Sequence, residues 1–124
     1  MILDTNALSA IVDGDPKVAE VLPPGRLAIP VIVLGEFRFG VQQSRRREGY
    51  MGWLAEHLSD YEVLDVTDMT TTHYAEIRIE SRQAGTPIPS NDIWIAALCR
   101  QHNLSILSRD RHFDLVKGLR RVGW

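Results

Sequence analysis

Short apolar runs alternate with segments of helical periodicity along the whole chain, and this alternation constrains the fold more than any other feature. We expect strands near residues 1–4, 26–30, 61–66, 104–107 and 120–122. We expect helices at about residues 6–12, 16–22, 31–45, 48–58, 69–84 and 91–102. Strands separated by helices pair in parallel and are covered on both faces, which predicts an α/β fold, a three-layer α/β/α sandwich with a mostly parallel five-stranded sheet. With 124 residues, the chain is expected to form one domain over residues 1–124.

Turn and cap residues support two of these boundaries. Asp15 and Pro16 have the pattern of a helix N-cap followed by proline, so the segment DGDP is interpreted as a helix start rather than a metal-binding loop. The segment QAGTPIPSND combines glycine, proline and serine, which favour the end of one helix and the start of the next. We expect Ser90 to be the N-cap of that next helix.

Acidic residues follow two of the predicted strands. Asp4 comes directly after the apolar residues MIL, and Asp110 lies three residues after the run LSIL. In open parallel sheets, ligands bind beyond the carboxyl ends of the strands, where both acids are expected to lie. Taken singly, each acid is more readily explained as a helix cap, but two acids at one edge of a sheet favour a binding site.

Two further acids lie on predicted helices. Glu36 projects from an apolar helix face, where a carboxylate without a cation is costly, and a salt bridge to Arg38 or Arg78 is the structural alternative. Asp92 lies in the first turn of an almost wholly apolar helix. The helix N-terminus alone would stabilise this carboxylate by about 0.3–1 kcal/mol, which is a sufficient explanation for Asp92 taken singly.

Four segments together resemble the PIN-domain nucleases, and in particular the VapC-like toxin ribonucleases of toxin–antitoxin pairs. These segments are LDTNALSA, VLGEFRFG, IPSNDIWIAA and ILSRDRHF, and they occur in the family's order over essentially the whole chain. The resemblance implies a sheet ordered 3-2-1-4-5. It places the family's acidic quartet on Asp4, Glu36, Asp92 and Asp110, and its supporting polar positions on Asn6 and Ser108, the latter often threonine in the family.

The same resemblance implies a function and partners. Members of the family hydrolyse RNA endonucleolytically and leave a 5′-phosphate and a 3′-hydroxyl. They form homodimers, and a cognate antitoxin wraps around the toxin and inhibits it. For this chain the resemblance therefore implies RNA as the substrate, a VapB-like antitoxin as a partner and a homodimer as the assembly.

A group of four carboxylates needs cations. Two like charges about 4 Å apart repel by roughly 4 kcal/mol at an effective dielectric constant of 20. Oxygen ligands without a cysteine or histidine pair favour Mg²⁺ or Mn²⁺ over Zn²⁺, and we expect one or two ions. The four histidines show no metal-binding spacing and are interpreted as surface or packing residues, namely His57, His73, His102 and His112.

Each acid has a role within this hypothesis. Asp4 and Asp110 would hold the principal ion, with Asp92 as a further ligand, directly or through water. Glu36 would orient or deprotonate the attacking water, or bind a second ion. Two neighbouring polar side chains would fix the carboxylates, namely Asn6 and Ser108.

The charge of the chain is compatible with an RNA partner. The net charge of −2 argues against a protein that simply coats itself with nucleic acid, but the chain is mildly basic once four acids are set aside as metal ligands. Most of its basic residues are arginines, whose planar fork suits phosphate. Candidate phosphate contacts are Arg45, Arg46, Arg109 and Arg111, although a run of arginines at residues 45–47 is more often a solvated turn.

The location of the protein is predicted from what the sequence lacks. No apolar run approaches the roughly 20 residues of a membrane helix, and the start of the chain has no signal-peptide pattern. We therefore expect a cytoplasmic protein that makes no membrane contact. The single cysteine, Cys99, lies in an apolar helical pattern and is predicted to be a packed thiol.

Three other readings are weighed against a nuclease. A receiver-like signalling module also has a doubly wound sheet and an acidic Mg²⁺ pocket, but it requires paired acids after the first strand, where Asp4 is followed by Thr5 and Asn6. A phosphatase of the haloacid-dehalogenase type would require D-x-D at that place. A catalytically silent binding protein of the PIN fold is distinguished by an RNA cleavage assay with and without chelator.

Overall fold

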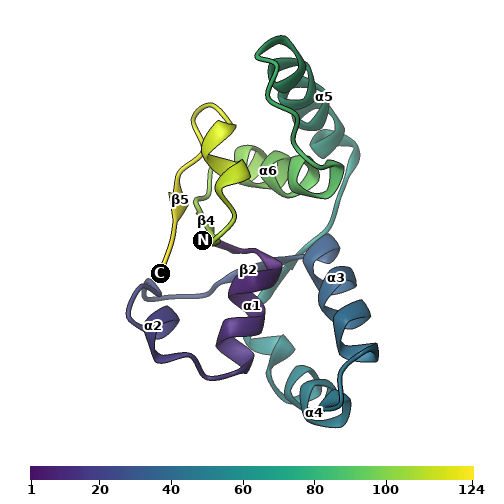
Figure 1. Ribbon diagram of the computed structural model, residues 1–124, viewed down its shortest axis with the longest axis vertical. Helices are drawn as coiled ribbons and strands as arrows, with labels where there is room; N and C mark the ends of the chain where they lie inside the picture. The colour runs from purple at the N-terminus through teal and green to yellow at the C-terminus, as the bar shows by residue number, and fades with distance from the viewer.

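Five short parallel strands form one sheet in the computed structural model, which describes all residues from Met1 to Trp124 (Figure 1). The strands are β1 (Ile2–Leu3), β2 (Ala28–Pro30), β3 (Glu62–Leu64), β4 (Ile106–Leu107) and β5 (Arg121–Val122). They lie in the order β3-β2-β1-β4-β5, and every pair is parallel. The predicted parallel sheet and its order are confirmed, although each strand is shorter than its predicted range.

The two central strands are fully buried, which explains why they are apolar without alternation. Ile2 and Leu3 of β1 are 0% exposed, and so are their partners in β4, Ile106 and Leu107. A strand that is covered on both faces has no solvent side on which polar residues would be favoured. Because β1 and β4 are parallel, their carboxyl ends meet at the same edge of the sheet.

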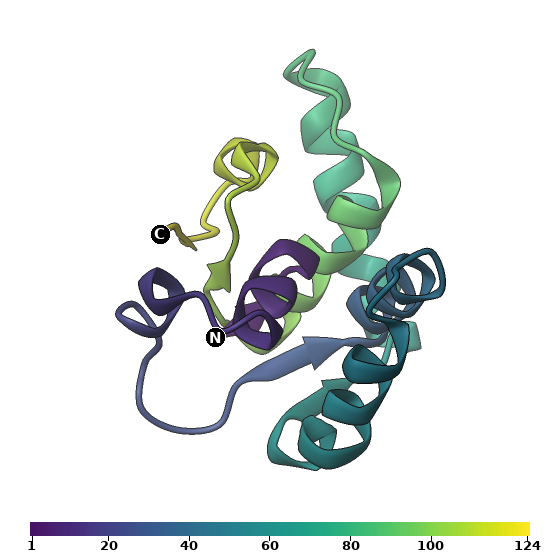
Figure 2. The ribbon, with the colours of Figure 1, turned by 60° about the horizontal axis from the view of Figure 1, so that its bottom comes forward.

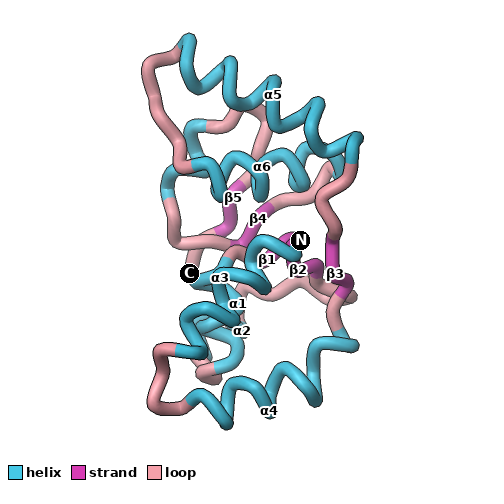
Figure 3. Tube along the Cα trace, turned by 90° about the vertical axis from the view of Figure 1, so that its right-hand side faces the viewer, coloured by secondary structure: helices cyan, strands magenta, loops and turns pink.

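Helices cover both faces of the sheet and complete the predicted three-layer sandwich. The α-helices are α1 (Thr5–Val12), α2 (Pro16–Ala19), α3 (Val31–Gln42), α4 (Arg47–His57), α5 (Asp68–Gln83) and α6 (Ser90–His102). Two 3₁₀ helices follow α4 and β4, namely η1 (Leu58–Asp60) and η2 (Arg111–Leu115). Figure 3 shows α5 and α6 together on one side of the strands and α4 on the other.

The beginning and the end of the chain meet next to the sheet. Figure 2 shows helix α1 at the centre of the molecule, with the segment that follows β4 beside it. The backbone N–H of Arg109 donates to Asn6 Oδ1 at 3.1 Å, which ties these two segments together. Asn6 and Arg109, which are more than a hundred positions apart in the chain, are thereby in direct contact.

Two predicted helices are shorter in the structure, and local chemistry explains both. The helix predicted for residues 16–22 ends at Ala19, because Pro23 disfavours a helical conformation in the residue before it and cannot itself continue the helix. The helix predicted for residues 31–45 ends at Gln42. Beyond it, Ser44 Oγ accepts a hydrogen bond from the N–H of Arg46 at 3.1 Å, a local turn that competes with the helix.

The prediction that Ser90 caps α6 is wrong. Pro89 occupies the N-cap position, Ser90 is the first helical residue, and no side chain caps this helix. Pro89 has an extended ψ of 144°, as is typical of an N-cap residue, but it offers no side-chain acceptor for the first N–H groups of the helix. Two other end signals are confirmed: Asp15 Oδ1 accepts from the N–H of Lys17 at 2.9 Å, and Gly85, just after α5, has a φ of +66°.

One apolar core extends from the sheet into the helices, and α6 contributes its longest buried run. Cys99 lies within this run, and burial raises the pKa of its thiol to about 12. The prediction of a packed, unreactive thiol is therefore confirmed. None of the helices combines the length and the apolar character needed to span a membrane.

Candidate functional site

Asp4 ends the first central strand and begins helix α1. It is only 5% exposed, and its Oδ1 accepts a hydrogen bond from the N–H of Thr5 at 2.8 Å. Burial raises the pKa of Asp4, and the negative charge of Asp110 acts in the same direction, against hydrogen bonds that lower it. Asp4 is thus a helix cap, as its position suggested, but a cap on a surface helix would not need this degree of burial.

Ser108 and Asn6 connect Asp4 to the segment that carries Asp110. Asp4 Oδ2 accepts hydrogen bonds from Ser108 Oγ at 2.6 Å and from Asn6 Nδ2 at 3.0 Å. Ser108 Oγ in turn accepts from the N–H of Asp110 at 2.9 Å. The two predicted supporting residues therefore contact Asp4 directly and hold the ends of β1 and β4 in a fixed relation.

Asp110 and Asp92 lie close together at the starts of η2 and α6. Asp110 is the N-cap of η2, where its Oδ1 accepts from the N–H of His112 at 2.9 Å. Asp92 lies in the first turn of α6 with its side chain 15% exposed. Burial, together with the negative charges of Asp110 and Asp4, raises the pKa of Asp92 to about 6. Three of the four predicted acids therefore repel one another in one small volume.

Glu36 reaches the same place from helix α3. Partial burial raises its pKa, and the charge of Asp4 raises it further. The alternative of a salt bridge finds no support, because no arginine contributes to the shift in the pKa of Glu36. The guanidinium of Arg78 instead donates a hydrogen bond to the Tyr74 hydroxyl at 2.7 Å. All four acids are thus brought together, and we call this set the acidic site: Asp4, Glu36, Asp92 and Asp110.

His112 belongs to this region, which the interpretation of the sequence missed. Its Nδ1 lies 2.9 Å from Asp110 Oδ1 and 3.4 Å from Asp92 Oδ2. One ligand atom from each of these three residues lies within 4.8 Å of the others. The surface or packing role expected for His112 rested only on the spacings between histidines in the sequence. The separation of two residues places His112 near Asp110, but no local pattern in the sequence indicates its proximity to Asp92.

Two of the predicted arginines flank Asp110 in the chain. The guanidinium of Arg109 lies 4.5 Å from the centre of the Trp124 ring, and its Nη2 lies 3.5 Å from Asp15 Oδ2. Arg111 is exposed at the first position of η2. Arg109 is therefore held by neighbouring side chains, whereas Arg111 extends into solvent.

The other two predicted arginines lie after α3. Arg46 Nη2 lies 3.6 Å from Asp13 Oδ1, and Arg45 is exposed. A hollow of about 290 Å³ links this turn to the acidic site, with a lining that includes Glu36 and Ser44. Ser44, the residue just before this turn, therefore shares a concave surface with Glu36.

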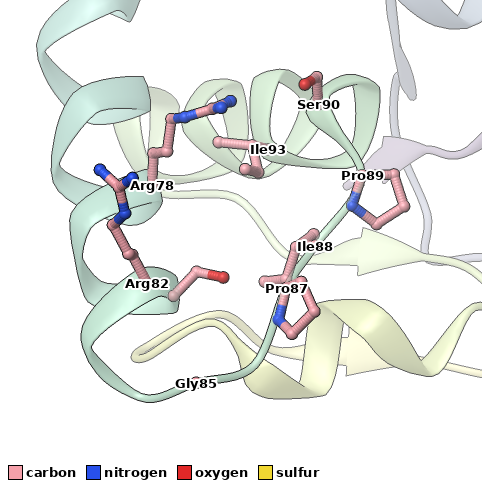
Figure 4. Close-up of a pocket in the computed structure, with 9 residues that line it drawn as sticks. Arg78, Arg82, Gly85, Pro87, Ile88, Pro89, Ser90 and Ile93 are labelled. Carbon is pink, nitrogen blue, oxygen red and sulfur yellow. The ribbon is translucent and has the colours of Figure 1, made fainter.

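A larger hollow of about 510 Å³ lies elsewhere, between the end of α5, the connection to α6 and the first turn of α6 (Figure 4). Arg78 and Arg82 line it from α5, and Ser90 lies at its α6 side. Its lining contains no carboxylate, and Ser90 and Asp92 point about 200° apart around the helix. It is therefore separate from the acidic site, and unlike that site it holds no carboxylate that could bind a cation or accept a proton.

The fold and the site together define a doubly wound α/β protein with an acidic site at the carboxyl ends of its two central strands. Residues 1–119 match the family model named "PIN domain". The chain belongs to the PIN-domain family, and within that family to the VapC ribonucleases. This membership excludes the receiver-like alternative, whose sheet has the different order 2-1-3-4-5.

Relatives of known structure or name resemble the chain over almost its whole length. It is 32% identical over 123 residues to "Ribonuclease VapC5" of Mycobacterium tuberculosis, covering 98% of this chain and 90% of the relative. It is 29% identical to "tRNA(fMet)-specific endonuclease VapC" of Shigella flexneri, covering 99% and 96%. The crystal structure of VapBC2 from Rickettsia felis bound to a promoter DNA fragment superposes with a TM-score of 0.86 at 27% identity, covering 99% and 97%.

Proposed function

We propose that this protein is a metal-dependent endoribonuclease that hydrolyses RNA phosphodiester bonds at the acidic site. The observation that carries the proposal is the convergence of four carboxylates from four separate segments, in which burial and mutual repulsion raise the pKa values of Asp4, Glu36 and Asp92. The ionised form of such a group costs folding free energy, and bound cations would offset this cost. The similarity to ribonucleases supports the choice of reaction.

The donor set fits Mg²⁺ or Mn²⁺. The acidic site offers carboxylate oxygens, which are the hard ligands that these ions prefer, and its shared negative charge requires a dication. Asp4, Asp92 and Asp110 would hold one or two ions. A bound ion would supply a more acidic water as nucleophile and would stabilise the charge that develops on the phosphate oxygens.

The other residues of the site would position and activate the reactants. Glu36 would orient the attacking water and accept its proton, because a carboxylate with a raised pKa is a better base near neutral pH. Ser108 and Asn6 would act as positioning residues, since their hydrogen bonds fix the Asp4 carboxylate and the N–H of Asp110.

Arginines around the acidic site would contact the phosphates of the RNA. Arg45 follows Ser44, and Arg46 pairs with Asp13; Ser44 and Asp13 both line the hollow that contains Glu36. Arg111 directly follows Asp110 in the chain. Arg109 is a weaker candidate, because it already contacts Trp124 and Asp15. For a single-stranded RNA, each lost phosphate contact should reduce the slope of log affinity against log salt by about 0.7.

We further propose that the chain is the toxin of a toxin–antitoxin pair, inhibited by a VapB-like antitoxin, and that it forms a homodimer. The similar Rickettsia felis structure is that of a VapBC protein on promoter DNA. Large apolar side chains stand exposed on α3 and α4, with Phe39 67% and Met51 47% exposed, and would be covered by protein partners. Light scattering of the free chain and co-purification with the antitoxin test these two assemblies.

The test of the reaction uses labelled RNA with Mg²⁺ or Mn²⁺, with and without a chelator. We expect the wild type to cleave with either ion, the chelator to abolish cleavage, and Asp110→Asn to lower the rate by at least about 100-fold. Asp65→Asn is the matched control, because Asp65 directly follows β3 as Asp4 follows β1, but it is exposed.

Two results would contradict the proposal. Cleavage by Asp110→Asn at the wild-type rate would remove the acidic site from the mechanism. RNA binding without cleavage under any metal condition would identify the chain as a catalytically silent PIN-fold protein. If cleavage occurs, mapping of 5′ ends in cells after brief expression, against Asp110→Asn, identifies the RNA that is cut.

A further inference from the structure

We infer that His112 is a nitrogen ligand of the ion bound at the acidic site, so that the site prefers Mn²⁺ and other transition metals to Mg²⁺. This inference rests on the metal dependence proposed above. It extends the site beyond its carboxylates to a side chain from the 3₁₀ helix η2.

The distances around His112 are those between neighbouring ligands of one ion. An ion that binds its ligands at about 2.1 Å has adjacent donor atoms about 3.0–3.4 Å apart, in octahedral or tetrahedral geometry. His112 Nδ1 lies 2.9 Å from Asp110 Oδ1 and 3.4 Å from Asp92 Oδ2. His112 therefore stands at ligand spacing from both acids, and one ligand atom from each of the three residues lies within 4.8 Å of the others.

The backbone already presents His112 to the acids. Its own N–H donates to Asp110 Oδ1 at 2.9 Å, and the next residue, Phe113, is 0% exposed in the core. Phe113 thus anchors η2, while the His112 side chain remains 46% exposed and contributes little to packing. The imidazole can therefore exchange its contacts with the two carboxylates for a shared ion without loss of core packing.

His112 differs from the other histidines that lie near carboxylates. His57 lies near Glu56 and Asp60, and His73 lies near Glu76, all within three residues in the chain, as expected for local contacts. His112 instead lies between Asp110, two residues away, and Asp92 on α6, which is distant in the chain. The arrangement resembles a ligand set more than a local ion pair.

A nitrogen ligand has a predictable effect on the choice of ion. Imidazole suits transition metals, whereas Mg²⁺ strongly prefers oxygen and retains its waters. Replacement of His112 by asparagine offers an amide oxygen close to the position of Nδ1. His112→Asn should therefore weaken Mn²⁺ binding more than Mg²⁺ binding.

The experiment compares the full-length wild type, His112→Asn and His57→Asn at about pH 8, where an unperturbed histidine is neutral. His57→Asn is the matched control, because His57 is similarly exposed and also lies 3.4 Å from an aspartate. Calorimetry measures the affinities for Mn²⁺ and Mg²⁺. Electron spin-echo spectroscopy of the Mn²⁺ protein detects a nitrogen bound directly to the ion.

We expect a directly bound nitrogen in the wild type and in His57→Asn, and none in His112→Asn. Mn²⁺ affinity should fall on the order of 10-fold in His112→Asn, with Mg²⁺ affinity changed by less than about threefold. If Mn²⁺ binds the wild type without a coordinated nitrogen, the inference is wrong while the proposed metal-dependent function stands. If neither ion binds the wild type, both the inference and the proposed metal dependence are wrong.

Discussion

Asp92 illustrates how one residue can oppose folding and still serve the site. Its folded-state pKa of about 6, against an ordinary 3.8, means that its ionised form at neutral pH costs roughly 2–3 kcal/mol in the absence of cations. Asp92→Asn keeps the shape and removes the charge. We expect the free energy of unfolding to rise by about 1–2 kcal/mol in chelator at pH 7.5 and RNA cleavage to fall by at least about 100-fold. Chemical denaturation and the cleavage assay measure the two effects, and a destabilised but active variant would contradict both.

Asp4→Asn should have the opposite effect on stability. The Asp4 carboxylate accepts hydrogen bonds from the N–H of Thr5, Asn6 Nδ2 and Ser108 Oγ. The NH₂ group of asparagine would have to face one of these donors inside a buried site, at a cost of about 1–3 kcal/mol. We therefore expect loss of activity together with a lower melting temperature. An Asp4→Asn protein as stable as Asp92→Asn would show that the hydrogen bonds around Asp4 are not as the structure has them.

At the residue scale, only Glu36 was unusual for its surroundings, because it lies on an apolar helix face. The other acids could each be explained singly as caps or by a helix N-terminus, so the full set came from the shared sheet edge of Asp4 and Asp110 and from the resemblance to a family. His112 could not be found in this way, because an exposed histidine in a polar turn needs no explanation. Its place beside Asp92 depends on contacts between η2 and α6, which local sequence patterns do not encode.

At the scale of elements, helix η2 connects the core to the acidic site, and this gives a test of positioning. Phe113 of η2 is fully buried, while Asp110 and His112 stand on the site side. Phe113→Leu should cost about 1 kcal/mol of stability but lower the cleavage rate by on the order of 10-fold or more, because small displacements of reacting groups are costly. The control is Ile77→Val in α5, with a similar expected loss of about 0.5–1.5 kcal/mol. Equal cleavage rates for the two variants would mean that η2 has no positioning role.

The existence and type of the elements were predictable, but their ends were not always. Apolar periodicity identified every strand and every α-helix, because burial imposes it directly. The ends depend on competition between small terms. Pro23 ends α2 early, Ser44 forms its own turn after α3, and Pro89 rather than Ser90 precedes α6. The Ser44 hydrogen bond stabilises its turn by about 1 kcal/mol or less, whereas Pro23 and Pro89 each remove a backbone donor.

At the scale of the whole molecule, strand order brings the acids together. The chain builds β1, β2 and β3 outward in one direction and then crosses back to place β4 on the other side of β1. Asp4 and Asp110 consequently follow adjacent central strands. Periodicity predicts strands but not their order, so this part of the fold came from the resemblance to a family and was confirmed by the pairing of Ile2 with Ile106 and of Leu3 with Leu107.

The acidic site also predicts how the stability of the whole molecule depends on pH and on cations. The pKa of Asp92 is raised to about 6, and the pKa values of Asp4 and Glu36 are raised as well, so the folded chain binds more protons than the unfolded chain between about pH 4 and pH 6. Stability without divalent ions should therefore fall as the pH rises through this window. Asp114, whose pKa is lowered by Arg121, acts in the opposite sense, but only below about pH 4.

Mg²⁺ should reverse this loss. An ion that binds only the folded state stabilises it by about 2.7 kcal/mol at a concentration 100 times its dissociation constant, and protons compete with it for the same carboxylates. Melting temperatures measured from about pH 5 to pH 8 should fall with pH in chelator, and the increase caused by Mg²⁺ should be larger at pH 7.5 than at pH 5. Asp92→Asn should flatten the curve in chelator, because it removes the group with the pKa near 6. If the wild type in chelator instead becomes more stable as the pH rises to 7, or if Mg²⁺ leaves its melting temperature unchanged at pH 7.5, the four carboxylates are not the coupled, cation-requiring group that their arrangement indicates.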